Sequence, residues 1–222
     1  MSRPGKGLPS WFERTVAYAG YGALSPVLLL CAVAVRFSSP GPVLFRQERV
    51  GKDGQPFRLL KFRSMRVNGG GALVTARGDA RVTGVGRFLR KTKLDELPEL
   101  WNVVRGELSL VGPRAEVPKY VDARDPLWQK VLQVKPGITD PVTLRLRNEE
   151  ELIAAGGGDP EVFYREVLQP LKLQGYVRYL ERRTVSSDLG VLVRTVFAVV
   201  IPSKAPPPTL GDLKKGAEHL FP

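Results

Sequence analysis

The longest apolar run of the chain lies near its N-terminus. Residues 15–35 carry no charged side chain and are bracketed by Arg14 and Arg36. A helix of this length would reach roughly 30 Å, which is the thickness of a bilayer core. Ser25-Pro26 stands near the middle, and proline removes a backbone donor and clashes with the preceding turn. The pattern therefore predicts a helix that is broken or kinked at Ser25-Pro26.

Basic residues flank this run on both sides: Arg3, Lys6, Arg14, Arg36, Arg46 and Arg49. Positive charge is normally kept on the cytoplasmic side of a membrane. A re-entrant helix, which enters the membrane, bends at the proline and leaves by the same face, suits both observations. Two other interpretations stay open. The run is also compatible with a simple spanning helix, or with a signal peptide cleaved after Ala32-Val33-Ala34.

After residue 39 the pattern changes to short alternating segments. Residues 43–50 and 57–62 predict two strands, and the turn Gly51-Lys52-Asp53-Gly54 between them contains an Asp-Gly step typical of hairpins. Residues 67–81 resemble a loop. The triple glycine at 69–71 has no following Gly-Lys-Ser/Thr, so it is not a phosphate-binding P-loop.

Helical spacing dominates the second half of the chain. It predicts helices at 97–104, 149–155, 160–168, from Pro170 to about 183, and 189–201. Ser186-Ser187-Asp188 offers a cap for the last of these, which we expect to pack on the domain or to lie at a membrane interface. The fold class is therefore α+β and mainly helical. Three parts follow: a membrane-inserted segment at 1–39, a catalytic domain at 40–202, and a Pro-rich, loosely ordered tail at 203–222.

Charge and composition narrow the chemistry. The net charge of +12 points to anionic partners, such as nucleic acid, a membrane leaflet or phosphorylated substrates. Cys31 is the only cysteine and His219, close to the C-terminus, the only histidine. This excludes a disulfide framework and a Cys-based zinc site and argues against a Ser-His or Cys-His pair. Carboxylates, basic side chains and a hard metal ion remain as the groups for catalysis.

The segment 87–100 combines such groups. Four basic residues precede the adjacent carboxylates Asp95 and Glu96, and a helix with Pro98 in its first turn follows. Asp95 would lie near the N-cap, where free backbone N–H groups and the helix dipole stabilise negative charge. Taken alone, this is also an ordinary helix start.

Seven short sequence blocks, which follow one another in a fixed order between residues 39 and 139, favour a functional role for Asp95 over an ordinary helix start. They are Ser39-Pro40-Gly41-Pro42-Val43, Phe45-Arg46-Gln47-Glu48-Arg49-Val50-Gly51, Lys61-Phe62-Arg63-Ser64-Met65, Leu94-Asp95-Glu96-Leu97-Pro98, Trp101-Asn102-Val103-Val104-Arg105-Gly106, Ser109-Leu110-Val111-Gly112-Pro113-Arg114 and Lys135-Pro136-Gly137-Ile138-Thr139. In order and spacing they resemble the bacterial sugar transferases, the monotopic polyprenyl-phosphate phosphoglycosyl transferases. Ser25-Pro26 is also similar to the break in that family's re-entrant helix.

The resemblance implies an enzyme that moves a phosphosugar from a UDP-sugar to polyprenyl (undecaprenyl) phosphate, releases UMP and initiates glycoconjugate assembly. It implies that Asp95 is the nucleophile and a Mg²⁺ ligand, that a covalent aspartyl phosphosugar forms, and that Glu96 orients groups or moves a proton. A carboxylate nucleophile needs no histidine, but nearby cations must offset the repulsion from the diphosphate. The implied place is the bacterial inner membrane, with a compact catalytic domain on its cytoplasmic face.

Lys61, Arg90 and Arg114 match the family's functional basic positions, and each is also compatible with a solvated surface charge. Gly112-Pro113 would let backbone approach a bound phosphate closely, or form an ordinary turn. The chain departs from the family pattern at Phe12-Glu13-Arg14, where a basic pair followed by Asp is usual, and after Thr139, where Asp140-Pro141 begins a variant segment.

Two rival classes stay open on the sequence. A basic nucleic-acid-binding protein would explain the charge but not the uncharged run at 15–35, and no zinc-finger spacing or RNA-binding aromatic signature is present. We therefore expect no nucleic-acid partner. A noncatalytic membrane-surface scaffold would explain the charge and the apolar ends, but not the ordered blocks.

Overall fold

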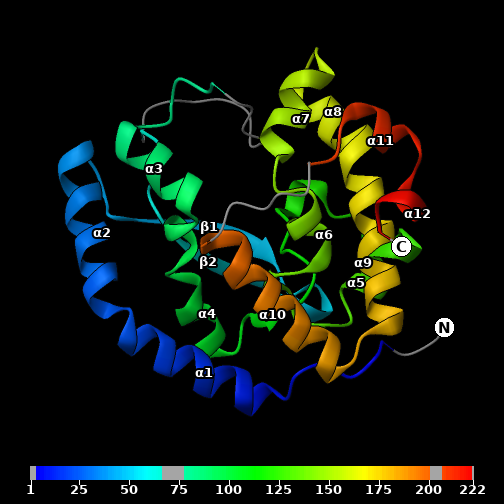
Figure 1. Ribbon diagram of the computed structural model, residues 1–222, viewed down its shortest axis with the longest axis horizontal. Helices are drawn as coiled ribbons and strands as arrows, with labels where there is room; N and C mark the ends of the chain where they lie inside the picture. The colour runs from blue at the N-terminus through cyan, green and yellow to red at the C-terminus, as the bar shows by residue number, and fades with distance from the viewer. Residues whose placement is uncertain (1–3, 67–77, 201–206, 222) are drawn as a thin grey trace.

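The two N-terminal helices form a bent pair along the edge of the molecule. The computed structural model describes residues 4–66, 78–200 and 207–221. Helix α1 (Ser10–Ala23) and helix α2 (Ser25–Ser38) meet at 63°, with Leu24 between them (Figure 1). The break falls directly before Ser25-Pro26, as the sequence predicts. Pro26 stands in the first turn of α2, where its missing N–H costs nothing.

Within the described ranges, no single helix has the length and apolarity to cross a membrane. Together, α1 and α2 have the length and composition of a broken span or a re-entrant loop. Several large apolar side chains of the pair are exposed: Trp11, Val16, Tyr18, Leu29, Leu30, Val33 and Phe37.

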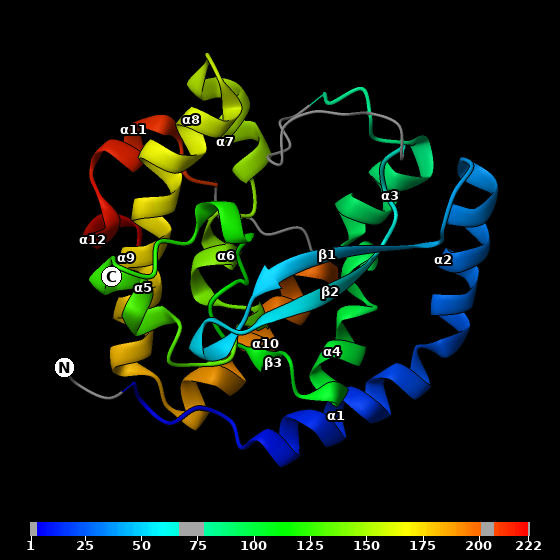
Figure 2. The same cartoon turned by 180° about the vertical axis from the view of Figure 1, so that it is seen from behind.

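A β-hairpin follows the helix pair. Strand β1 (Leu44–Val50) pairs antiparallel with β2 (Pro56–Phe62) through the short 3-10 turn η1 (Lys52–Gly54), and Figure 2 shows this hairpin at the front of the molecule. Asp53 has φ 56°, which suits the Asp-Gly step. The predicted hairpin is confirmed to within one residue at each strand. The loop predicted at 67–81, after the hairpin, lies largely outside the described residues. The triple glycine at 69–71 lies entirely outside them.

Helix α4 (Glu99–Arg105) lies on the edge of this hairpin. The fully buried Asn102 accepts the Leu60 N–H at 3.1 Å and donates to the Arg58 carbonyl at 2.8 Å. One amide side chain therefore satisfies two backbone groups of β2 and fixes the distance between the strand and the helix.

A second, parallel sheet crosses the centre. Strand β3 (Ser109–Val111) pairs with β4 (Gly137–Thr139), and this pairing has no counterpart in the sequence prediction. A Cβ on Gly137 would lie 2.1 Å from the Gly112 backbone nitrogen, so the close approach of the two segments requires glycine there.

The remaining helices are short, apart from α9 and α10, and build the larger part of the core. They are α5 (Pro126–Val131), α6 (Pro141–Arg145), α7 (Glu149–Gly156), α8 (Pro160–Phe163), α9 (Gln169–Arg182), α10 (Val185–Val200), α11 (Leu210–Lys214) and α12 (Ala217–Leu220), with 3-10 turn η3 (Pro118–Tyr120) before α5. A π-helical turn at Tyr164–Leu168 joins α8 to α9. The largest apolar cluster gathers around α9, whose buried face meets α5, α6 and the C-terminal helix α12.

Two predictions for the C-terminal part are wrong. The described part of the tail is not loosely ordered: a Thr209–Asp212 capping box starts α11, Leu213 and Leu220 belong to the main core, and Ala217 is buried. Helix α10 begins four residues before the predicted start, and Asp188 does not cap it. Instead, Thr184 accepts the Ser187 N–H at 3.1 Å.

The N-terminal segment is fastened to the core by buried charges. Asp188 pairs with Arg183 at 2.8 Å and accepts the Leu8 N–H at 3.0 Å. Glu13 of α1, only 3% exposed, accepts the Leu110 N–H of β3 at 2.9 Å. The variant residue Glu13 thus ties helix α1 to the strand that leads to Arg114.

Candidate active site

Asp95 lies in a tight turn between two helices. Helix α3 (Gly84–Thr92) starts at Thr83, whose hydroxyl accepts the Gly86 N–H, and ends at Lys93 in the left-handed conformation. The 3-10 turn η2 (Leu94–Glu96) follows, and Pro98 stands just before α4. Asp95 therefore precedes the helix by a full turn and forms no side-chain cap, so the predicted N-cap position is wrong. Its carboxylate is not used in capping.

The Asp95 carboxylate is buried and incompletely bonded. The residue is 7% exposed, and among the described residues its Oδ1 atom has no hydrogen-bond partner. Leaving a buried acceptor unpaired costs roughly 1–3 kcal/mol, so such an atom in a cluster of charges marks a place for a ligand.

Glu96 lies beside it and is held by two cations from separate segments of the chain. Lys61 of β2 donates to Glu96 Oε1 at 2.9 Å, and Arg114 pairs with the same oxygen. Lys61 and Arg114 are thus brought together at the Asp-Glu pair, as the resemblance implied. Neither is a solvated surface charge: their side chains are 17% and 25% exposed.

Glu99 is a third carboxylate of this cluster, beside Asp95 and Glu96, and it was not identified from the sequence. It is 2% exposed, and its Oε1 lies 3.2 Å from Lys61 Nζ, an ion-pair distance without hydrogen-bond geometry. The signal was present in the segment 87–100, but Glu99 looked like an ordinary first-turn acid of a helix.

The surroundings shift the pKa values of these three acids in different directions. Burial, followed by the charge of Glu96, raises the pKa of Asp95 above its ordinary value. Burial also raises the pKa of Glu99. Burial acts on Glu96 in the same direction, but Arg114, Lys61 and Lys93 outweigh it and hold the Glu96 pKa well below its usual range. Glu96 is the firmly ionised member, and Asp95 is the one whose charge depends on its surroundings.

Arg90 faces the site from α3 and is paired elsewhere. Its guanidinium acts electrostatically on Asp95 and forms an ion pair with Glu150, in the first turn of α7. This contact joins α3 to α7, which stand apart at the top of the molecule in Figures 1 and 2. Glu150 lies in the variant segment and was not identified from the sequence.

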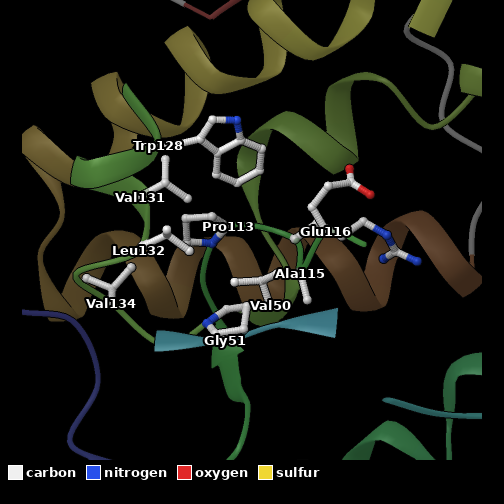
Figure 3. A pocket seen from close by; sticks show the side chains of 11 residues that line it. Val50, Gly51, Pro113, Ala115, Glu116, Trp128, Val131, Leu132 and Val134 are labelled. Atoms are coloured by element: carbon white, nitrogen blue, oxygen red, sulfur yellow. The ribbon is translucent and has the colours of Figure 1, made fainter. Parts of the chain in front are cut away.

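Gly112 and Pro113 directly precede Arg114 in the chain. Both are buried, and the side of Gly112 that a Cβ would occupy is filled by backbone of residues 135–137. The described contacts give Gly112 a role in packing, and backbone approach to a phosphate stays a prediction. Pro113 lines a small hollow with Trp128, Val131 and Leu132 on one side and Val50 on the other (Figure 3). Its cavity volume of about 10 Å³ is far below the roughly 300–1,000 Å³ of small-molecule sites.

Arg49 extends the cluster and was also missed as a site residue. It donates to the Ala115 carbonyl at 2.9 Å and pairs with Glu116 at 3.2 Å, and Glu116 in turn accepts from the Tyr164 hydroxyl. This network joins β1 to the segment after Arg114. It fixes the backbone directly after that arginine.

The donor set suits a hard cation bound together with a phosphate. Among the residues that the structure describes, no group of three or more Asp, Glu, His or Cys side chains is arranged to hold a metal ion. Mg²⁺ is usually held by one or two carboxylates plus substrate phosphate oxygens. The unpartnered Asp95 Oδ1 fits that requirement, whereas Glu96 is occupied by Lys61 and Arg114.

Comparison with known proteins gives a consistent result. The family described as "Bacterial sugar transferase" matches residues 6–202. The chain is 38% identical over 187 residues to the UDP-glucose:undecaprenyl-phosphate glucose-1-phosphate transferase of Caulobacter vibrioides, covering 82% of this chain and 65% of the relative. It is 38% identical over 207 residues to the exopolysaccharide production protein ExoY of Sinorhizobium fredii, covering 86% and 84%.

A third relative names a different sugar. The UDP-N-acetylgalactosamine-undecaprenyl-phosphate N-acetylgalactosaminephosphotransferase of Aeromonas hydrophila is 47% identical over 120 residues, which cover 52% of this chain and 28% of the relative. The chain therefore spans between about a quarter and two thirds of the length of the curated transferases from Caulobacter and Aeromonas.

Proposed function

Because the chain belongs to the bacterial sugar transferase family, we propose that it transfers a sugar phosphate from a UDP-sugar to undecaprenyl phosphate and thereby initiates polysaccharide assembly. The observation that carries the proposal is the buried Asp95 carboxylate, with Oδ1 unpartnered, next to a Glu96 held by Lys61 and Arg114. The names of the relatives supply the substrate class.

The proposed reaction has two displacements. The Asp95 carboxylate attacks the phosphorus that bears the sugar, the bond to the bridging oxygen breaks, and UMP leaves with the electron pair. The lipid phosphate then attacks the same phosphorus, and the Asp95 carboxylate leaves. The product is a polyprenyl diphosphate sugar, and Asp95 is regenerated. The first step needs Asp95 ionised and its repulsion from the diphosphate offset.

Lys61, Arg90 and Arg114 supply that offset. Preorganised cations in a site with little water stabilise charge far better than they would in solution. Glu96 keeps Lys61 and Arg114 at fixed positions beside Asp95, which is a positioning role. A Mg²⁺ ion held by Asp95 and the diphosphate would supply further charge neutralisation and make UMP a better leaving group.

The bent helix pair suggests how the enzyme meets its lipid. We place α1 and α2 in the cytoplasmic leaflet of the bacterial inner membrane as a re-entrant, monotopic anchor, with the catalytic part on the cytoplasmic face. Single cysteines at residues 6 and 40, in a Cys31→Ser background, should then label from the same side of the membrane. Labelling from opposite sides would leave a spanning helix instead.

The test of the activity is a screen of UDP-glucose, UDP-galactose and the UDP-N-acetylhexosamines with undecaprenyl phosphate and Mg²⁺. The expected product is UMP, not UDP. Without lipid, one UMP per protein should appear and the sugar label should stay on the chain. Asp95→Asn should abolish both signals. Glu166→Gln, which replaces an exposed acid in the turn at Tyr164–Leu168, should change neither.

Four results would count against parts of the proposal. Turnover in Asp95→Asn would remove Asp95 as nucleophile. Release of UMP only with lipid present would replace the two steps by one direct displacement. No UMP from any UDP-sugar would favour the noncatalytic scaffold, and tight, salt-dependent binding of nucleic acid by the same preparation would favour the other rival.

A further inference from the structure

Lys93 adopts a backbone conformation that normally belongs to glycine. Its φ and ψ are 59° and 14°, and it ends α3 and begins the turn that carries Asp95. Its N–H bonds to the Arg90 carbonyl, and its own carbonyl accepts the Glu96 N–H, both at 3.3 Å. Glycine is the usual residue at such a helix end because it has no Cβ. A lysine here carries strain that glycine would avoid, which calls for a reason in its side chain.

The ammonium of Lys93 is available, whereas the other cations around Asp95 are engaged. Lys61 and Arg114 are paired with Glu96, and Arg90 with Glu150. The Lys93 side chain is exposed and makes no ion pair or hydrogen bond with the residues that the structure describes. It nevertheless lies close enough to act electrostatically on both Asp95 and Glu96.

We infer that Lys93 is a phosphate-binding residue of this site, whose ammonium binds the phosphate group that approaches Asp95. The inference rests on the proposed function for the identity of that group. A phosphate that comes to Asp95 meets two carboxylates at close range, and three of the four surrounding cations are already shared with acids. Lys93 brings a positive charge at the exposed rim of the turn, with all three N–H donors free for oxygen ligands.

A different role for Lys93 would be purely structural. A lysine at the end of a helix stabilises the helix dipole and the last carbonyl groups. In that case, removing its charge would lower the thermal stability of the protein and would leave phosphate binding unchanged. If Lys93 binds phosphate, loss of its charge weakens phosphate binding and leaves stability unchanged. If its role is structural, the same change lowers stability and leaves phosphate binding unchanged.

Binding to the full chain in detergent separates them. The probes are inorganic pyrophosphate, which represents the diphosphate donor, and farnesyl phosphate, which represents the lipid acceptor, both measured by calorimetry at low ionic strength. Lys93→Gln keeps the backbone strain and removes the charge, so it should weaken one or both probes about tenfold. Lys91→Gln is the matched control, because it removes an exposed charge from the same helix away from Asp95.

Three further readouts complete the test. Lys93→Arg should restore binding, Lys93→Gly should bind as weakly as Lys93→Gln while melting at the same or a higher temperature, and added salt should shrink the difference from the parent protein. A loss confined to pyrophosphate assigns Lys93 to the donor, and a loss confined to farnesyl phosphate assigns it to the acceptor.

Unchanged binding of both probes by Lys93→Gln would overturn the inference, as would an equal loss in Lys91→Gln. These binding results do not depend on turnover. If the parent protein released no UMP from any UDP-sugar, the proposed function would fail while pyrophosphate binding still decided the role of Lys93.

Discussion

Lys61 Nζ lies 2.9 Å from Glu96 Oε1, and this contact joins strand β2 to the turn that carries Asp95. Arg114, beyond β3, pairs with the same carboxylate oxygen. Three distant segments of the chain therefore meet at one acidic side chain that is 13% exposed. Because two cations share one anion there, positive charge remains beside Asp95 for an incoming phosphate.

Replacing Glu96 by Gln tests that arrangement. The amide still occupies the space but leaves Lys61 and Arg114 without a charged partner in a mostly buried place. We expect a loss of about 1–3 kcal/mol in the free energy of unfolding. For a chain of this size, that lowers the melting temperature by about 2–4 °C per kcal/mol. Thermal unfolding in detergent measures it. Glu166→Gln, at a 62% exposed position, is the control; equal melting of the two variants would contradict the structural role of Glu96.

The acid limb of the pH–rate profile should belong to Asp95. Burial and the charge of Glu96 raise the pKa of Asp95 above 3.8, so Asp95 stays protonated over a window where an ordinary aspartate is ionised. The nucleophile must be ionised, so UMP release in a single turnover should increase as the pH rises through this raised pKa. In Glu96→Gln the neighbouring negative charge is gone, and the limb should move to lower pH. An unmoved limb would mean that another group titrates.

The same shift has a consequence for stability. An acid whose pKa is higher in the folded than in the unfolded state opposes folding once it is ionised, and this cost vanishes below its unfolded pKa of about 3.8. Asp95→Asn should therefore melt at a higher temperature than the parent protein at neutral pH. The gain should shrink as the pH falls through the raised pKa.

Arg90 and Glu150 should behave differently from each other. Arg90→Ala removes a cation from the surroundings of Asp95 and should lower kcat/KM by about 100-fold. Glu150 is 46% exposed, so Glu150→Gln should cost less than about 1 kcal/mol of stability. It frees Arg90 for the substrate, and KM for the UDP-sugar should stay the same or fall. If both variants lost stability equally and kept their kinetics, the ion pair would only fasten α3 to α7.

Local patterns predicted the elements whose cause is local. The hairpin follows from alternation and an Asp-Gly turn, and the break between α1 and α2 follows from Pro26. The parallel pairing of β3 with β4 could not be predicted, because each strand has three residues and the contact depends on Gly112 meeting Gly137 across a distant stretch of chain. The helices of the tail are equally short and are held by burial, α12 on α9 and α11 on α7.

The residues of the site also fall into two groups, those that the sequence identified and those that it did not. Asp95, Glu96, Lys61 and Arg114 were found because their motif blocks resemble a family, and the structure brings them together. Glu99, Arg49 and Glu150 were not found. Each is an ordinary charge in its local sequence, and its place in the site depends on partners from other segments, which spacing along the chain does not reveal.

Glu13 offers a last test, which concerns the connection between helix α1 and the site. Its carboxylate accepts the Leu110 N–H at 2.9 Å, in the strand that leads to Arg114, and the residue is only 3% exposed. Glu13→Ala leaves that buried N–H unpaired and should cost about 1–3 kcal/mol of stability. Glu13→Gln keeps an acceptor oxygen and removes a charge that burial disfavours, so it should melt close to the parent protein. Melting curves of the two variants, recorded with the activity of the folded fraction, decide the matter. Equal losses would mean that the charge of Glu13, rather than its hydrogen bond to β3, holds α1 in place.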